Sequence, residues 1–251
     1  MTSVLSDTGL IFGRYLRQTL RSRISLVFGL LQPMLYLAFF GPLLEDVPLG
    51  GDGDSWQTLV PGLLVQLALF SSAFAGFGII MEKQLGIVER MRVTPVSRLA
   101  LLLGRVLRDA AQLLVQSTIL LLTGVAFGLR APVLGVLVGF LFVAVLGISL
   151  ASLSYAFAMR VSTVQEFAPV VNSFSLPAML LSGILLPMAL APAWLDVVSH
   201  FVPFRYLVDG VRAAFVGDYL STDLGLGVLV GAVLAGATLT LGTQLFRRAG
   251  A

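Results

Sequence analysis

The sequence predicts an all-α integral membrane protein with six transmembrane helices, because of its composition, its apolar runs and the distribution of its positive charges. Hydrophobic residues make up 57% of the 251 residues and charged residues 12%, unlike a soluble globular domain. The absence of cysteine excludes disulfides and thiolate metal sites. Runs near the length needed to cross about 30 Å of hydrocarbon lie at 24–44, 57–81, 106–128, 133–157, 167–189 and 224–246.

Positive charges fall mainly on one side of this topology. If the N-terminus is inside, Arg130, Arg205 and Arg212 are the only outside members of the 16 Lys and Arg residues, which leaves 13 inside. Such a bias in short loops sets the orientation of membrane proteins. We therefore predict a multi-pass protein with both ends in the cytoplasm. The same arginines flank the spans, so the net charge of +3 is explained without nucleic-acid binding.

The predicted topology can be tested by cysteine labelling, because the chain has no native cysteine. A single Arg90→Cys variant is expected to resist a membrane-impermeant maleimide in intact cells and to react after permeabilisation. Asp52→Cys, in the predicted outside segment 45–56, is the control that should react in intact cells. Labelling at position 90 in intact cells would show that the assigned orientation is inverted.

Residues 8–23 predict an amphipathic helix ahead of the first span. A basic stripe lies opposite an aromatic and aliphatic one when the segment is placed on a helical wheel. The basic residues are Arg14, Arg17 and Arg21, and the opposite residues are Phe12, Tyr15, Leu16 and Leu20. This pattern is typical of a helix lying in the cytoplasmic interface. The helix serves as an anchor, as an elbow that docks a partner or gates lateral access, or as both.

The segment 82–98, EKQLGIVERMRVTPVSR, predicts a short amphipathic helix between the second and third spans. Its charged residues are Glu82, Lys83, Glu89 and Arg90, its apolar face is Leu85, Ile87, Val88 and Met91, and Arg92 is the exception. A helix floating on lipid is expected to show mostly Lys and Arg on its polar face, whereas mixed signs favour docking to a soluble protein. Thr94 and Pro95 match an N-cap and first helical position for the third span.

The outside segment 190–223 predicts two short helices that dip back toward the membrane. Pro192 suits a first helical turn and Pro203 separates the two helices. Trp194 and Tyr206 are residue types that favour the headgroup level. On the second helix, one face carries a predicted ladder of ion pairs. Its members are Arg205, Asp209 and Arg212.

The sequence lacks the motifs of several enzyme classes. Lys83 is the only lysine and follows Met81 and Glu82 rather than glycines, so no phosphate-binding loop exists. His200 is the only histidine, which excludes two-histidine metal sites. The middles of the spans are nearly free of charge, which argues against proton or ion coupling. Asp109 is shallow and expected to pair with Arg105, and Glu166 is shallow as well.

Uncharged polar residues do lie deep within the predicted spans. Their side chains hydrogen-bond between helices or line a path for substrate. Gln112 and Gln116 are one turn apart on one face. The candidates for a substrate path are Gln66, Gln112, Gln116, Asn172, Ser175 and Ser182.

Two stretches resemble a known family: residues 82–98 above, and LSGILLPMALAPAWL with FVPFRYLVDGVR, between Leu181 and Arg212. With them, nearly the whole chain resembles the membrane subunit of ABC-2-type exporters, in particular daunorubicin-type drug-resistance permeases. The resemblance implies one transmembrane domain over 1–251, a cytoplasmic coupling helix at 82–92 and an external re-entrant hairpin at 190–215. The implied ATPase-coupling residues are Glu82, Lys83, Gly86, Glu89, Arg90 and Arg92. The implied hairpin residues are Pro187, Pro192, Trp194, Pro203, Tyr206, Asp209 and Arg212.

The resemblance implies a permease subunit of an ATP-binding cassette exporter that moves a hydrophobic or amphipathic drug, lipid or glycolipid outward. A partner ATPase would use ATP and Mg, so this chain itself is expected to bind no cofactor and to catalyse no reaction. A second copy or a paralogous permease would complete a dimer, in contact with lipid, in the plasma membrane of a bacterium. Two alternatives are a membrane scaffold or assembly factor that transports nothing, and an ATP-independent lipid transporter.

Overall fold

The computed structural model describes residues 4–21, 23–44, 54–87 and 98–248, and every regular element among them is a helix. The predicted all-α fold class is therefore confirmed. The helices are α1 (Val4–Arg21), α2 (Arg23–Leu44), α3 (Ser55–Ala73), α4 (Phe77–Gln84), α6 (Arg98–Ala126), α7 (Val133–Ala158), α8 (Val164–Leu181), the 3-10 helix η1 (Met188–Leu190), α9 (Ala193–Ser199), α10 (Pro203–Val216) and α11 (Thr222–Arg248).

Four helical stretches in the described part of the chain are long and apolar enough to cross a membrane. They are Ser55–Gln84, Leu103–Ala126, Val133–Ala158 and Thr222–Gly242. They match the second, third, fourth and sixth predicted spans. α2 contributes a shorter apolar stretch, Gly29–Leu44, and α8 has 18 residues with two internal prolines. Four spans are thus supported by helix length and composition, and the total of six stays a prediction.

α3 is the helix around which the others pack. It begins with a capping box, in which Asp54 Oδ1 accepts from the Ser55 amide at 2.8 Å and Gln57 Oε1 accepts from the Asp54 amide at 3.0 Å. Leu63 and Leu64 are completely buried in the middle of α3. Because α3 contacts α2, α6, α7, α8 and α10, it has no free face and positions the residues of several other helices.

Small residues let α7, α10 and α11 approach one another closely. A Cβ added at Gly135 of α7 would lie 2.8 Å from the carbonyl carbon of Ala214 in α10, and closer still to its oxygen. A Cβ at Gly227 of α11 would lie 2.8 Å from the carbonyl oxygen of Tyr206 in α10. α10 is therefore wedged between two longer helices with almost no side-chain space on either side.

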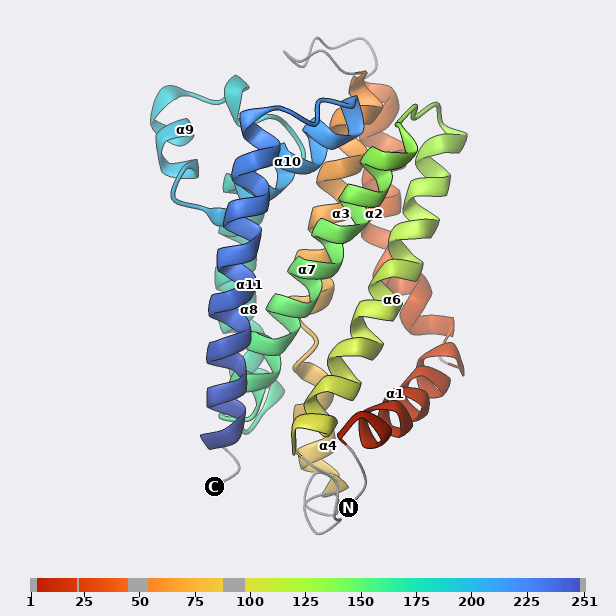
Figure 1. The fold of residues 1–251 in the computed structure, drawn as a ribbon, viewed down its shortest axis with the longest axis vertical. Coiled ribbons are helices and arrows are strands. Elements are labelled where there is room, and N and C mark those ends of the chain that lie inside the picture. Colours follow the sequence, from red (N-terminus) through yellow and green to blue (C-terminus); the bar gives the residue numbers. More distant parts are fainter. Residues whose placement is uncertain (1–3, 22, 45–53, 88–97, 249–251) are drawn as a thin grey trace.

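The two ends of the bundle carry different elements (Figure 1). α1, α4 and the C-terminal end of α11 lie at one end, whereas α9 and α10 lie at the other. α1 packs along α6, which holds the N-terminal helix against the bundle. The arrangement separates the segments that the charge distribution assigns to opposite sides of the membrane.

The fifth predicted span, 167–189, ends earlier than its hydropathy indicates. α8 stops at Leu181 and Gly183 follows with φ of +68°, a left-handed conformation that glycine adopts without steric cost. The apolar residues after Gly183 form a turn and the short helix η1 instead of another helical turn. Pro187 sits immediately before η1 with extended ψ of 135°.

The predicted coupling helix, 82–92, also differs from the structure at its start. Residues 82–84 form the last turn of α4, which continues the second span, and Gly86 has φ of +68° two residues after the helix ends. That left-handed turn separates Glu82 from the rest of the predicted helix. Residues 88–97, including Thr94 and Pro95, lie outside the described residues.

Candidate functional site

A polar cavity of about 360 Å³ lies between α2, α3 and α6. The structure brings together three of the predicted path residues, Gln66, Gln112 and Gln116, and adds Gln32. The remaining lining residues are Gly29, Pro33, Leu67, Phe70, Ser71 and Phe74. Gln32 was missed by the sequence analysis, although the rule that selected the other glutamines, a polar side chain deep in an apolar run, would have found it.

Helical spacing and one glycine explain why these amides meet. Gln112 and Gln116 are one turn apart, so they project from the same face of α6. Opposite them, Gly29 of α2 has no side chain. A Cβ at Gly29 would overlap Gln116 Nε2 and lie 3.5 Å from Gln116 Cδ. The amide of Gln116 therefore occupies the space that a larger residue at position 29 would fill.

The side-chain amides differ in whether their oxygen and nitrogen atoms have hydrogen-bond partners. Gln32 Nε2 donates to the Tyr36 hydroxyl at 3.3 Å, and Gln112 Oε1 accepts from Arg108 Nη1 at 3.5 Å. Gln66 is 2% exposed, and its Oε1 has no hydrogen-bond partner among the residues that the structure describes. A buried acceptor without a donor costs about 1–3 kcal/mol, so Gln66 is poised to accept a hydrogen bond.

The other three predicted path residues do not line this cavity. Asn172, Ser175 and Ser182 belong to α8 and the residue that follows it. Asn172 is exposed, whereas Ser175 and Ser182 are buried. The Ser182 hydroxyl donates to the carbonyl of Ala178, which satisfies it within its own helix. The structure therefore divides the predicted set into two separate groups.

A cluster of charges ties α1, α4 and α6 together at one end of the bundle. Glu82 of α4 forms an ion pair with Arg105 of α6. The Tyr15 hydroxyl of α1 donates to Glu82 Oε1 at 3.0 Å and accepts from Arg105 Nε at 3.1 Å. Burial raises the pKa of Tyr15 and Arg105 opposes this shift. The phenol therefore stays protonated at neutral pH and keeps donating to Glu82.

The structure describes some of the predicted ATPase-coupling residues and not others. Glu82, as described, pairs within the chain. Lys83 Nζ donates to the carbonyls of Val161 at 2.8 Å and Met159 at 3.2 Å, where it satisfies acceptors at the end of α7. On the helical wheel, Glu82 and Lys83 lie on the charged face that was predicted to dock a partner. A wheel represents a single segment, so it could not show contacts with helices distant in the sequence. Glu89, Arg90 and Arg92 lie outside the described residues.

Asp109 does not pair with Arg105 as predicted. Its Oδ1 lies 3.1 Å from Arg108 Nη1, and its other oxygen accepts from the Tyr155 hydroxyl of α7. Arg105 is instead taken by Glu82, which approaches from α4. The i, i+4 spacing places Arg105 and Asp109 within reach of each other on α6. The tertiary contact between Arg105 and Glu82 forms instead of that ion pair.

At the opposite end, Arg212 of α10 joins three segments. Its Nε donates to the Thr58 carbonyl of α3 at 3.0 Å, and its Nη2 donates to the carbonyls of Gly183 at 2.8 Å and Ile184 at 3.2 Å. The side chain is 12% exposed. Burial lowers the pKa of Arg212 to about 10, and Asp209 opposes the shift, so the guanidinium remains charged at neutral pH.

The predicted ladder on α10 is present but is not the main support of its arginines. Asp209 lies 3.6 Å from Arg205 Nε and 3.7 Å from Arg212 Nη1. Arg205 makes a shorter ion pair, 2.6 Å, with Asp196 of α9, and this pair connects the two short helices. Burial raises the pKa of Asp209, against the effect of Arg212 and Arg205. The Asp209 carboxylate thus loses much of its hydration and gains only two long ion pairs in its place.

The remaining hairpin residues lie at helix ends or on the surface. Pro192 is the N-cap of α9 and Pro203 is the first residue of α10, where its missing N–H removes no helical bond. Trp194 is 68% exposed. The Tyr206 hydroxyl donates to the His200 carbonyl at 3.1 Å. This contact closes the connection between α9 and α10.

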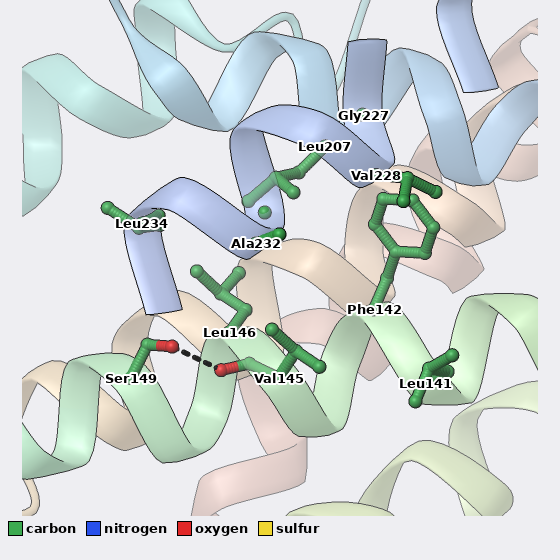
Figure 2. A pocket seen from close by; sticks show the side chains of 11 residues that line it. Leu141, Phe142, Val145, Leu146, Ser149, Leu207, Gly227, Val228, Ala232 and Leu234 are labelled. Carbon is green, nitrogen blue, oxygen red and sulfur yellow. Dashed lines mark hydrogen bonds between the residues drawn. The ribbon is translucent and has the colours of Figure 1, made fainter. Parts of the chain in front are cut away.

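A second cavity is an apolar groove of about 160 Å³ between α7, α10 and α11. Figure 2 shows the side chains that line it, including Phe142 of α7, Leu207 of α10 and Val228 of α11. The one hydroxyl in the lining, Ser149, donates to the Val145 carbonyl of its own helix at 2.6 Å. The groove offers no hydrogen bond to a ligand, and none of the predicted path residues lines it.

Comparisons with known proteins agree with this architecture. A family profile described as ABC-2 type transporter matches residues 7–216. A protein of Cyanophora paradoxa named as transport permease ycf38 is 28% identical over 200 residues, which cover 78% of this chain and 69% of that protein. A protein of Mycobacterium tuberculosis named as doxorubicin resistance ABC transporter permease DrrC is 26% identical over 229 residues, 88% of this chain and 82% of that protein.

A third relative is named as daunorubicin resistance ABC transporter permease protein DrrB1, from Streptomyces coeruleorubidus. It is 23% identical over 226 residues, which cover 89% of this chain and 80% of that protein. The family profile spans well over half of the sequence and includes every helix from α2 to α10. The chain therefore belongs to the ABC-2 type transporter family, as the sequence resemblance predicted.

Proposed function

We propose that this chain is the permease subunit of an ATP-driven exporter that moves a hydrophobic or amphipathic molecule outward. The observation that carries the proposal is the amide-lined cavity between α2, α3 and α6, which is a polar binding volume among apolar helices. Family membership and the drug-resistance names of two relatives support a transport role. The substrate would reach the membrane's outer side along this cavity.

Energy would enter through the segment that joins α4 to α6. The partner would be an ABC ATPase that binds ATP and Mg, and the permease would not be an enzyme by itself. Glu82 lies in the last turn of α4 and Arg105 lies about two turns into α6, and their ion pair and contacts with Tyr15 hold both helices to α1. A push on the segment would therefore be transmitted to α6, which forms one wall of the cavity.

The complete exporter would contain a second copy of this chain or a paralogous permease. We place it in the plasma membrane of a bacterium, with both termini in the cytoplasm. The orientation follows from the charge distribution. The proposal is supported by the position of α1 and the C-terminal end of α11 at the same end of the bundle (Figure 1).

Reconstitution with a partner ATPase tests the proposal. The chain is co-expressed with a candidate ABC ATPase, and uptake of a hydrophobic fluorescent dye is measured in inside-out vesicles with and without ATP. The control replaces the catalytic glutamate of the ATPase by glutamine. Uptake that depends on ATP supports an exporter. Lipid or dye movement without the ATPase would point to an ATP-independent transporter, and the absence of both transport and ATPase binding would point to a scaffold.

Reversing two charges of the predicted coupling helix tests how the ATPase is held. Glu89→Lys with Arg90→Glu is expected to lower ATPase affinity at least about tenfold, because like charges then face each other across an interface. Co-purification and ATP-dependent uptake are both measured. Arg130→Glu, at an exposed residue of the α6–α7 connection, is the matched control. Unchanged ATPase binding in the double variant would exclude docking through this face.

A further inference from the structure

The described residues that line the cavity between α2, α3 and α6 include amides but no charged side chain. The cation that touches its wall is Arg108, which contacts Gln112 and is itself paired with Asp109 at 3.1 Å. A charge brought into such a cavity would lose its hydration and gain no counter-charge, which is unfavourable. The lining therefore favours an uncharged ligand.

The lining includes a buried acceptor without a donor in the described part of the chain. Gln66 Oε1 accepts no hydrogen bond from the described residues, although Gln66 lies in the centre of the most buried helix. Several hydroxyls elsewhere in the bundle are satisfied by their own helices, as Ser152 is by Ile148 and Thr238 by Leu234. A ligand that brings an O–H or N–H donor would give Gln66 the bond it lacks.

The rest of the lining is apolar. Pro33 of α2, Leu67 and Phe70 of α3, and Phe74 just after α3 provide this surface. Aromatic and aliphatic side chains next to a few oriented polar groups are typical of sites for small amphipathic molecules. The cavity volume of about 360 Å³ lies within the range of such sites.

We propose that this cavity selects neutral amphipathic molecules that donate a hydroxyl or N–H hydrogen to Gln66 Oε1. The inference rests on the proposed function and names the class of substrate that the exporter accepts. Gln66 is the specificity residue, because its Oε1 gives higher affinity to a ligand that has a hydrogen-bond donor than to one that has none. The apolar wall formed by Phe70 and Phe74 holds the remainder of the molecule. The amides of Gln32, Gln112 and Gln116 form the rest of the polar lining.

Three probes that differ in one group test this selection. They are 1-pyrenemethanol, its methyl ether, and 1-pyrenemethylamine, which are respectively a neutral donor, a neutral molecule without a donor, and a cation at neutral pH. The full chain is placed in phosphatidylcholine nanodiscs, whose lipid offers no hydroxyl or N–H donor. The saturable part of tryptophan-to-pyrene energy transfer gives each Kd.

The wild-type chain is expected to bind the alcohol about tenfold more tightly than the ether, which corresponds to about 1.4 kcal/mol, and more tightly than the amine. Gln66→Leu is expected to remove the preference for the alcohol while retaining affinity for the ether. This variant should fold, since it removes a buried atom that has no partner. Thr118→Val, at an exposed hydroxyl that bonds to Leu114 of its own helix, is the control that keeps the preference.

A second variant tests the position of the cavity. Gly29→Ala would displace the amide of Gln116 into the cavity and is expected to weaken binding of the alcohol and the ether alike. The proposal is overturned if the wild type binds alcohol and ether equally, if the amine binds as tightly as the alcohol, or if Gln66→Leu keeps the preference.

Binding and export are measured separately, so the two proposals can fail separately. ATP-dependent uptake without any preference for the alcohol would leave the exporter function standing and reject the selectivity. A preference that depends on Gln66 in a chain that never supports ATP-dependent uptake would keep the binding site and reject the exporter function.

Discussion

Arg212→Met is expected to destabilise the folded protein by about 3–5 kcal/mol, the cost of removing one partner from a buried ion pair. The variant leaves the carbonyls of Thr58, Gly183 and Ile184 without their donor and Asp209 with only the long contact to Arg205. Domains are stable by about 5–15 kcal/mol in total, so much of the protein should be lost. The measurements are the yield of monodisperse protein and its thermal midpoint in detergent.

Asp209→Asn is the matched control for this prediction. It removes the ion pairs of the ladder but leaves all three backbone carbonyls bound to Arg212, and Arg205 keeps Asp196. Its midpoint should fall much less than that of Arg212→Met. Arg212→Lys should lie between them, because one ammonium group cannot reach carbonyls on two segments in the fixed geometry of a guanidinium. Equal losses for Asp209→Asn and Arg212→Met would show that the ladder, and not the carbonyls, holds α10.

Gly62→Ala is expected to destabilise the protein by about 3 kcal/mol, at the upper end of the cost of overpacking. A Cβ at Gly62 would lie 2.9 Å from the carbonyl carbon of Ile184 and closer to its oxygen. Both atoms belong to backbone, so no side-chain rotation relieves the overlap. The turn at Gly183 must move away from α3, and the bond from Arg212 to Ile184 is strained with it. The thermal midpoint in detergent again gives the result.

Gly78→Ala provides the comparison, since it lies in the same 30-residue apolar stretch and a Cβ there meets nothing within 4 Å. This variant should be as stable as the wild type or slightly more stable, because alanine is the better helix former. A Gly62→Ala variant with an unchanged midpoint would show that the turn after α8 yields freely. Combined with Arg212→Met, Gly62→Ala should add less than its separate cost, because both changes act on one contact.

The two variants concern one junction, which the sequence only partly anticipated. Arg212 was predicted to pair with Asp209, and that pair exists, but the guanidinium mainly binds carbonyls of α3 and of the turn after α8. Hydropathy extended the fifth span through 189, so a turn at Gly183 was not expected. Without that turn, the carbonyls of Gly183 and Ile184 would not have been free to accept from Arg212.

The cavity was predicted more fully than the charge clusters were. Gln66, Gln112 and Gln116 were selected because polar side chains are rare in apolar runs, and that rarity is visible in a single segment. Whether their side chains line the same cavity depends on how α3 and α6 are rotated about their axes. The same rule selected Asn172, which is exposed, because composition does not distinguish a face toward the bundle from a face toward lipid.

The sequence by itself determined the all-helical class, four stretches long and apolar enough to cross a membrane, and the family. These properties depend on hydropathy, local helix signals and short motifs, which act between residues close in the chain. The tertiary structure decided which polar groups meet: Tyr15 with Glu82, 67 positions apart, and Arg212 with Thr58, 154 positions apart. Such partners are set by the packing and rotation of helices, where a buried polar group takes the donor or acceptor that the neighbouring helix presents.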